Sequence, residues 1–293
     1  MATEQPAQEQ KLPVFSAGVE YWNNTDASVN GVLGALGSDS TPVPRLDATS
    51  SRLLILSLLP ALSTITPPHH TKSSPTPRRS YRALDCGAGI GRVTSTVLLP
   101  LFDRVDLVEP VRKFVNQAKR NSDKGKEGWK SLKAGKGVRM WLAGLQFFDP
   151  LAPAVPIGGG ESELIATVGS KDLSWPKPEE QFDLQDGYDL VMIQWCIGHL
   201  SDAQLVEFLK RSRKALREGE NGTEGYIMLK ENICKDTDGE GAGQLFDDDD
   251  SSITRSDKVF RQVFADAGLE IIKREIQQGF PAELFPVVSY ALR

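Results

Sequence analysis

A buried strand that ends in a glycine-rich turn constrains this chain more than any other sequence feature. Residues 82–86 (RALDC) have the composition of a buried strand, and glycines follow at positions 87, 89 and 91. Glycine lets the backbone turn sharply and approach a ligand closely. In open α/β sheets, ligands bind beyond the carboxyl ends of the strands. The turn therefore predicts an α/β fold with a nucleotide-like ligand at this end of the strand.

An acidic residue after the next strand narrows the choice of ligand. Glu109 closes the apolar run 104–108, where its carboxylate can accept hydrogen bonds from both hydroxyls of a ribose. A glycine turn followed by an acid suits NAD as well as S-adenosylmethionine (AdoMet), and a lone turn of this kind can also be purely structural. Here the spacing is GxGxG, with Asp85 before it and without the third glycine position of dinucleotide sites. AdoMet has no pyrophosphate to place on a helix N-terminus, so we expect AdoMet as the cofactor.

Strands and helices alternate from Tyr81 to the end of the sequence. Such alternation gives a mostly parallel sheet that is covered by helices on both faces. The expected strands are residues 82–86, 104–108, 138–143, 188–194, 225–230, 269–277 and 287–292, and helices are expected at 93–99, 111–121, 201–216 and 256–268.

The polar segments divide the chain into one domain with additions. A length of 293 residues is compatible with a single α/β domain. We expect residues 1–14 to be disordered and residues 15–293 to form the domain, with an N-terminal helical cap over 15–66. Polar composition predicts inserted surface loops near residues 66–80, 121–136 and 150–186.

The expected cap contains two helical parts. A short helix followed by a glycine-rich loop is expected over residues 15–36. An apolar helix is expected from about Arg52, with Ser50 or Ser51 as its N-terminal cap.

Charge, cysteine content and hydropathy limit the partners and the location. The formal net charge is −5 and no long basic block is present, so we expect no nucleic-acid partner. Three scattered cysteines without CxxC spacing are typical of reduced thiols in a cytoplasmic protein, which can also be nuclear, and indicate no metal site. The longest apolar stretch, residues 53–62, is too short to span a bilayer and contains Pro60, so we expect no membrane partner.

A polar and aromatic sequence follows the expected strand 188–194. Gln194, Trp195 and His199 would lie at the mouth of the cofactor crevice. Trp195 offers a flat wall for a proline ring or a methyl-bearing group, and His199 could form a hydrogen bond with an amine. Ordinary core packing for Trp195 and a helix cap for His199 are the alternatives.

A second polar sequence follows the expected strand 225–230. Lys230, Glu231 and Asn232 come first, and residues 246–255 (FDDDDSSITR) come later. An aspartate run is usually a solvated loop. Because Phe246 and Ile253 flank this run, part of it could fold onto the site, where clustered carboxylates would attract a cationic substrate.

These motifs together resemble the protein α-N-terminal methyltransferases. The resemblance rests on YW at 21–22, LDCGAGIGR at 84–92, GLQFF at 144–148, IQWCIGHL at 193–200, KEN at 230–232, DDDDSSITR at 247–255 and SYALR at 289–293, all in the order of that family. It implies a class I, Rossmann-like methyltransferase fold with a seven-stranded, mostly parallel sheet and an N-terminal helical extension.

The resemblance also implies a substrate and a set of site residues. The substrate would be a protein whose exposed N-terminus reads Xaa-Pro-Lys after removal of Met, with ribosomal proteins as candidates, and the products would be mono-, di- or trimethylated. We expect a monomer. The resemblance assigns cofactor binding to Gly87, Gly89, Arg92, Glu109, Leu145, Gln146 and Gln194, substrate binding to Trp22, Leu33, Gly34, Trp195, Asp247 and Ser252, and catalysis to Asp250, His199 and Asn232.

We expect Asp250 and His199 to accept the proton of the substrate α-amine while Asn232 orients the peptide end. Three positions depart from the family pattern: Glu109 and Glu231 stand where Asp is frequent, and Phe285 stands where Tyr is frequent. The first two keep the charge, whereas Phe285 removes a hydroxyl.

Two alternatives remain open at the level of the sequence. One is a methyltransferase of the same fold that acts on a small molecule or a nucleic acid, because a fold does not determine a function. The other is a non-catalytic relative that binds a peptide through its acidic segment. The presence of Glu109, His199, Asn232 and Asp250 favours an enzyme.

Overall fold

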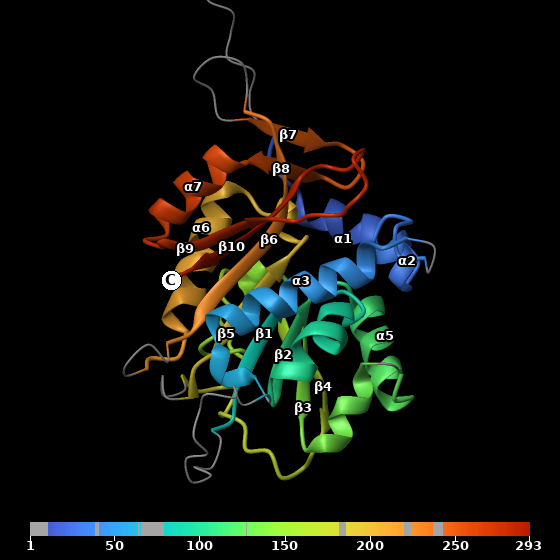
Figure 1. Cartoon of the computed structure of the whole chain (residues 1–293), viewed down its shortest axis with the longest axis vertical. Coiled ribbons are helices and arrows are strands. Elements are labelled where there is room, and N and C mark those ends of the chain that lie inside the picture. Colours follow the sequence, from blue (N-terminus) through green and yellow to red (C-terminus); the bar gives the residue numbers. More distant parts are fainter. Residues whose placement is uncertain are drawn as a thin grey trace, which may run out of the picture.

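A large mixed sheet runs through the middle of the molecule and carries helices on both faces (Figure 1). The computed structural model describes residues 11–38, 41–63, 65, 79–126, 128–181, 186–219, 224–236 and 243–293. The main path of the sheet is β4-β3-β2-β1-β5-β6-β10-β9. Its strands are β1 (Arg82–Cys86), β2 (Arg104–Glu109), β3 (Gly137–Ala143), β4 (Ser162–Gly169), β5 (Leu190–Gln194), β6 (Tyr226–Cys234), β9 (Ile271–Ile276) and β10 (Val287–Leu292).

The centre of this sheet is parallel and fully buried. β1 pairs in parallel with β2 on one side and with β5 on the other, and every residue of these three strands is buried. β5 (LVMIQ) accordingly reads as a nearly continuous apolar run, whereas β1 and β2 also contain buried charged residues. The carboxyl ends of β1, β2, β3, β5 and β6 consequently meet at one edge of the sheet.

Three strands were absent from the expected sheet. β4 pairs antiparallel with β3, and the hairpin of β7 (Gln244–Asp247) and β8 (Ser252–Ser256) joins the end of β6 through β8. The class I methyltransferase fold is confirmed, but the expected count of seven strands is wrong because of these additions. β10 pairs antiparallel with β6 on one side and with β9 on the other.

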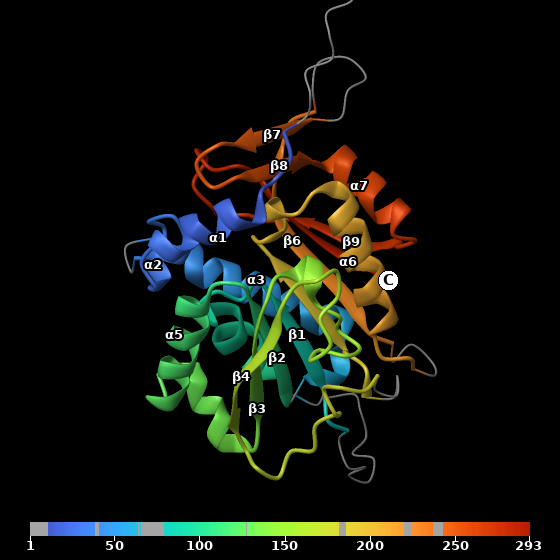
Figure 2. The ribbon, with the colours of Figure 1, turned by 180° about the vertical axis from the view of Figure 1, so that it is seen from behind.

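Helices pack on the two faces of the sheet and form two apolar cores (Figures 1 and 2). One core lies under α3 (Val43–Leu58), a π-helix (Thr94–Leu98) and α4 (Leu99–Leu101), and the other under α6 (Asp202–Lys214) and α7 (Asp257–Asp266). α5 (Arg112–Asp123) contacts β2, β3 and β4. In the described part of the chain, no helix is both long and apolar enough to cross a membrane.

The N-terminal cap lies over the carboxyl edge of the strands. It begins with α1 (Phe15–Asn24) and α2 (Val29–Val32) and continues into α3. The backbone N–H of Val14 donates to Ser251 Oγ at 2.9 Å, and Lys11 pairs with Asp248 at 2.7 Å. Residues 11–14, expected to be disordered, therefore pack against the β7–β8 turn, whereas residues 1–10 lie outside the described residues.

The long apolar helix begins earlier than expected. α3 starts at Val43, so Ser50 and Ser51 lie in its interior and cannot be its caps. Ser50 instead donates to Gln277 Oε1 at 2.6 Å. The prediction placed the start too late because the apolar run 53–62 was taken as the helix, whereas the buried face of α3 also includes polar residues.

The expected surface insertions are more structured than predicted. In the segment 121–136, Trp129 begins a short 3-10 helix and is buried against Gly91. In the segment 150–186, β4 extends the sheet, and the carbonyls of Ser174 and Pro176 accept hydrogen bonds from Arg104 and Arg139. Most of the segment 66–80 lies outside the described residues.

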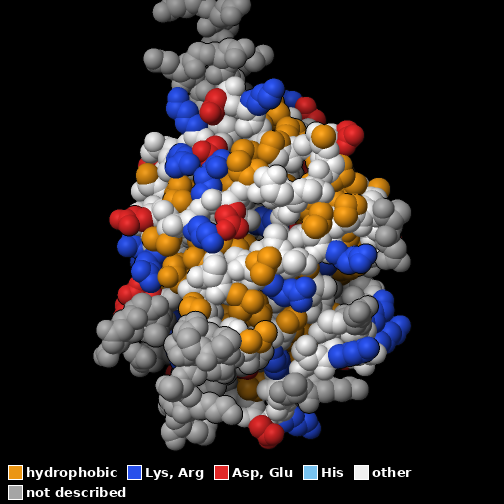
Figure 3. Space-filling model, viewed as in Figure 1, with side chains coloured by type: hydrophobic (Ala, Val, Ile, Leu, Met, Phe, Trp, Pro, Cys, Tyr) orange, Lys and Arg blue, Asp and Glu red, His pale blue; other side chains and the backbone are white. Residues whose placement is uncertain are grey.

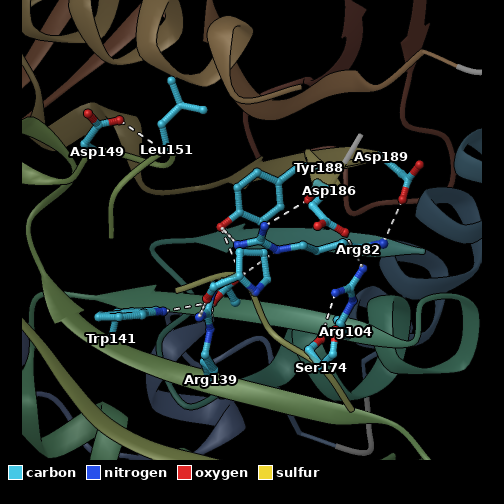
Figure 4. A network of polar contacts seen from close by, with 12 residues as sticks. Arg82, Arg104, Arg139, Trp141, Asp149, Leu151, Ser174, Asp186, Tyr188 and Asp189 are labelled. Atoms are coloured by element: carbon cyan, nitrogen blue, oxygen red, sulfur yellow. Dashed lines mark hydrogen bonds and ion pairs between the residues drawn. The ribbon is translucent and has the colours of Figure 1, made fainter. Parts of the chain in front are cut away.

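A cluster of buried charges lies between the sheet and the segment 150–186. The carboxylate of Asp106 accepts hydrogen bonds from Arg82, Arg139, Trp141 and Tyr188, at 2.7–3.0 Å for the shortest contact of each. Figure 4 shows these four donors turned toward a common point. Burial alone would raise the pKa of Asp106, but the two guanidinium groups outweigh it and hold this pKa far below its usual range.

Candidate active site

Two adjoining hollows lie at the carboxyl edge of the strands, beneath the cap. The first has a volume of about 730 Å³ and is lined by the glycine turn, by the ends of β2 and β3, and by α1. The second has a volume of about 990 Å³ and is lined by the ends of β5 and β6, the β7–β8 turn and the loop 280–287. Trp22, Val32, Trp195 and His199 line both. A ligand in one hollow would therefore lie next to a ligand in the other.

The glycine turn leaves room for a ligand because its backbone is left-handed. Gly87 has φ +60° and Gly89 has φ +56°, a region that residues with a side chain adopt rarely. A Cβ atom at position 87 would also lie 2.2 Å from the Cβ of Cys196. Any larger residue at Gly87 would strain the turn and displace the segment after β5.

Glu109 reaches back from the end of β2 to the glycine turn. Its Oε2 accepts the N–H of Gly89 at 2.8 Å and its Oε1 accepts the N–H of Val111 at 2.9 Å. Burial raises the pKa of Glu109 to about 7, although these two hydrogen bonds oppose the shift. Each carboxylate oxygen has a second lone pair, so both ribose hydroxyls of a nucleoside could still bind.

His199 is held by the cap. The indole Nε1–H of Trp22 donates to His199 Nε2 at 2.8 Å. Because an indole nitrogen only donates, Nε2 must be unprotonated here and the neutral ring carries its hydrogen on Nδ1. Burial lowers the pKa of His199, against the opposing charge of Asp250.

Trp195 adopts a backbone conformation that needs support from its surroundings. Its φ is +52°, which costs about 1–3 kcal/mol for a residue other than glycine. Its N–H donates to the carbonyl of Lys230, and its ring lies 5.5 Å from the Arg92 guanidinium and 6.4 Å from the Phe280 ring. Such strain is typical of residues that serve a binding site.

Buried polar atoms without a partner gather around the two hollows. In the described part of the chain, five of nine such side-chain atoms belong to residues at this site: Gln194 Oε1, Trp195 Nε1, His199 Nδ1, Glu231 Oε2 and Asp250 Oδ1. Buried polar groups are nearly always hydrogen-bonded in proteins. The donors and acceptors left here indicate ligands that carry both kinds of group.

The structure brings most of the expected site residues together. Gly87, Gly89, Glu109, Leu145 and Gln146 line the first hollow, Leu33, Asn232, Asp250 and Ser252 line the second, and Trp22, Trp195 and His199 line both. Arg92 and Gln194 line neither hollow but meet at Asp47. Gly34 and Asp247 also fall outside the lining, and Asp247 is exposed on β7.

Several residues of the site escaped the sequence analysis. Phe15 and Phe114 line the first hollow, and Phe280 and Leu284 line the second. No short motif marks them. Glu231 and Phe285 were named in the sequence analysis but not assigned to the site, yet both line the second hollow, and burial raises the pKa of Glu231 to about 7.

Comparison with known proteins agrees with this geometry. The family model described as AdoMet dependent proline di-methyltransferase matches residues 10–154 and 168–293. The alpha N-terminal protein methyltransferase 1 of Arabidopsis thaliana is 32% identical over 283 residues, which are 96% of this chain and 80% of that protein. The N-terminal Xaa-Pro-Lys N-methyltransferase 1 of Homo sapiens is 33% identical over 286 residues, which are 97% of each chain.

A solved structure gives the same result. A SAM-dependent methyltransferase from Leishmania major has a TM-score of 0.64 and 30% sequence identity, over 95% of this chain and 82% of that chain. The family match is interrupted at residues 155–167, where the chain leads into β4. The extra edge strand therefore begins in a part of the chain that the family model does not match.

Proposed function

The chain belongs to the AdoMet dependent proline di-methyltransferase family, and we propose that it methylates the α-amino group of proteins whose exposed N-terminus reads Xaa-Pro-Lys. One observation carries this proposal. Trp195 and His199 form the shared wall between the glycine-turn hollow and a second hollow that holds Asn232 and Asp250. An aromatic wall, an amide and a carboxylate suit a peptide end that carries a proline ring and an amine.

The first hollow fits AdoMet. Gly87 and Gly89 line this hollow, and Glu109 keeps lone pairs for ribose hydroxyls. When it is bound there, AdoMet supplies an electrophilic methyl group next to the second hollow. The nearby Gln194 Oε1, buried and without a partner, is an acceptor that the amino-acid end of the cofactor can use.

Asp250 accepts the proton that the substrate amine must lose. An α-amino group has a pKa of about 7.7–8.0, so removal of its proton at pH 7 costs only about 1–1.5 kcal/mol. Asp250 Oδ1 is buried and has no hydrogen-bond partner among the described residues, which leaves it available for this amine. The lone pair of His199 is already used by Trp22, so His199 can share the proton only if Trp22 moves.

The same geometry accounts for the peptide sequence. The second residue, proline, packs on the Trp195 ring, and Asn232 orients the peptide end from the neighbouring strand. The lysine ammonium would reach out of the hollow past Ser252 to Asp247, which is exposed at the end of β7. A first residue other than proline can take three methyl groups, whereas proline can take two.

The charges on the surface favour a peptide over a nucleic acid. On the face shown in Figure 3, basic side chains are interspersed with acidic and apolar ones, apart from a short row of basic side chains near α5. The net charge of the chain is −5. A surface that follows a phosphate backbone is normally a continuous basic patch.

The test uses labelled AdoMet and a hexapeptide that begins Ser-Pro-Lys, beside the same peptide with an acetylated N-terminus. The proposal expects label in the free peptide only, because acetylation removes the nucleophilic amine. Label in both peptides would place the methyl group elsewhere. Label in neither, with AdoMet binding intact, would favour a small-molecule or nucleic-acid acceptor or a non-catalytic peptide-binding relative. Ribosomal proteins with such N-termini are the first protein substrates to examine.

A further inference from the structure

Three polar side chains from different strand ends converge on one acid of the cap. Asp47 lies on the buried face of α3. Its Oδ1 accepts from Gln194 Nε2 at 2.8 Å and from Lys230 Nζ at 2.6 Å, and its Oδ2 accepts from Arg92 Nη1 at 2.6 Å. The donors follow β1, end β5 and lie within β6, so one carboxylate connects α3 to three neighbouring strands of the parallel sheet.

The charge on Asp47 fixes the orientation of Gln194. Burial alone would raise the pKa of Asp47, but Arg92 and Lys230 outweigh it and hold this pKa below its usual range. An ionised carboxylate can only accept hydrogen bonds, so the amide of Gln194 must turn its nitrogen toward Asp47. The amide oxygen then points the other way, where it is buried and has no partner in the described part of the chain.

Asp47 fixes Arg92 in the same way. Only one of the guanidinium nitrogens of Arg92 has a hydrogen-bond partner among the described residues. The guanidinium lies over the Trp195 ring and is mostly buried, with 9% of the side chain exposed. Arg92 directly follows the glycine turn, and the Trp195 ring against which its guanidinium lies is a wall of the cofactor hollow.

This arrangement matches the amino-acid end of the cofactor. That end carries an ammonium group, which donates hydrogen bonds, and a carboxylate group, which accepts them. Gln194 offers a free acceptor and Arg92 offers free cationic donors, and both are oriented by the same carboxylate. We infer that Asp47 is a positioning residue that orients Arg92 and Gln194 for the amino-acid end of AdoMet and thereby couples the cap helix α3 to cofactor binding.

The coupling extends beyond the cofactor hollow. Lys230 Nζ also donates to Ser51 Oγ on α3 at 3.2 Å and to Gln277 Oε1 at 2.9 Å. Gln277 begins the loop that carries Phe280 and Leu284 into the second hollow. Occupancy of the first hollow is thus connected to a wall of the second. The inference concerns the cofactor only and does not depend on which molecule accepts the methyl group.

The first test measures the dissociation constant of S-adenosylhomocysteine (AdoHcy) by calorimetry. Asp47→Asn removes the charge with little change in shape, and we expect the dissociation constant to rise about tenfold or more, because two charge-assisted contacts lose their orientation. Ser51→Ala is the matched control on the same helix: it removes a hydrogen bond to Lys230 and should leave the dissociation constant within about twofold. A dissociation constant for Asp47→Asn within about twofold of the original would overturn the inference.

A double-mutant cycle shows whether Asp47 acts through Arg92. Asp47→Asn is combined with Arg92→Gln, and AdoHcy binding is measured for all four proteins. If Asp47 orients Arg92, the combined loss of affinity should be smaller than the product of the single losses by about threefold or more. Losses that multiply would show that the two residues act independently and would contradict the positioning role.

A third test uses the unaltered protein, so it does not depend on the folding of any variant. Coupling between two sites is reciprocal. Saturating AdoHcy should therefore slow amide hydrogen exchange in α3, whereas 5′-methylthioadenosine, which lacks the amino-acid end, should not. Equal protection of α3 by both ligands, or by neither, would contradict the inference. Equal slowing in the glycine turn by both ligands confirms that both are bound.

Discussion

Buried carboxyl groups occur at both ends of this sheet, and the protein holds them in opposite ways. Asp106 has four side-chain donors within hydrogen-bonding distance, and its pKa is far below the usual range because Arg139 and Arg82 outweigh the effect of burial. At the carboxyl ends of the strands, burial raises the pKa of Glu109 and of Glu231 to about 7. At one end of the sheet the chain itself supplies most of the hydrogen-bond partners, whereas at the other end it leaves buried polar atoms available to ligands.

The two ends differ because of what covers them. Around Asp106, the carbonyls of Ser174, Pro176 and Asp186 each accept an N–H group of a neighbouring arginine, so most of the polar cluster is satisfied. Arg104 Nε alone of these guanidinium atoms is buried without a partner among the described residues. Asp250 instead lines the second of the two adjoining hollows, which lie beneath the cap. A satisfied buried network stabilises a fold, whereas unsatisfied groups with shifted pKa values are typical of functional sites.

The strongest way to test this contrast is to remove the charge of Asp106. Asp106→Asn would remove the buried charge that pairs with both Arg82 and Arg139, so we expect the free energy of unfolding to fall by about 3–5 kcal/mol. Equilibrium urea denaturation measures this loss. AdoHcy affinity of the folded protein should stay within about twofold, because the cluster faces away from the hollows. A loss of stability below about 1 kcal/mol would show that this cluster is not the structural counterpart we describe.

The converse substitution is Asp250→Asn at the site. It removes a proton acceptor but keeps the size of the side chain, so we expect turnover of a Ser-Pro-Lys peptide to fall by about a hundredfold or more. AdoHcy affinity and the urea midpoint should hardly change, because Asp250 Oδ1 loses no hydrogen bond to any residue that the structure describes. Equal losses of turnover and of AdoHcy affinity would mean that Asp250 shapes the cofactor hollow instead.

The sequence predicts the parallel part of the fold well, because those strands are recognisable from local pattern. β1 has the expected bounds, Arg82–Cys86, and the apolar runs of β2 and β5 lie where the alternation put them. The β7–β8 hairpin escaped because its sequence is polar. β8 is held by pairing with the distant end of β6, a contact that no local pattern contains.

Local sequence patterns are equally limited in predicting the residues of the site. Glu109, Trp195, His199 and Asp250 stand in motifs and could be named from the sequence. Asp47 could not, because the helix was expected to begin at about Arg52. Once α3 begins at Val43, residues 43, 47, 48, 51, 54 and 55 form its buried stripe, and an acid in that stripe is the signal that was missed.

The pH dependence of AdoHcy affinity tests whether the raised pKa of Glu109 matters for cofactor binding. The pKa of Glu109 is about 7 in the free protein, so a falling pH protonates it and removes an acceptor for ribose hydroxyls. AdoHcy affinity should therefore approach its maximum by about pH 8 and be about tenfold weaker at pH 6 than at pH 8. Without ligand the sign is opposite: the contribution of Glu109 to the free energy of unfolding is greatest below pH 4.5 and is lost as the pH rises through 7.

The control for this dependence is Glu109→Gln. Its affinity should be weaker and nearly constant between about pH 6 and pH 8, because the side chain no longer titrates. Asp85 lies nearby, with a pKa that burial raises to about 6. If the original slope persists in Glu109→Gln, it belongs to Asp85 and not to Glu109.

The smallest expected effect comes from the contact that links the cap to the site. Trp22→Phe keeps an aromatic ring against Phe114 but removes the N–H that donates to His199 Nε2. We expect kcat/KM for the peptide to fall about two- to tenfold, the usual value of one hydrogen bond. The pKa of His199 should also rise, because that bond favours the neutral ring, and the acid side of the pH profile should move upward. Tyr21→Phe on the same helix, at a side chain that is 40% exposed, is the matched control and should change neither quantity. An unchanged pH profile in Trp22→Phe would mean that the cap only covers the site, whereas a shift would show that it also sets the protonation of His199.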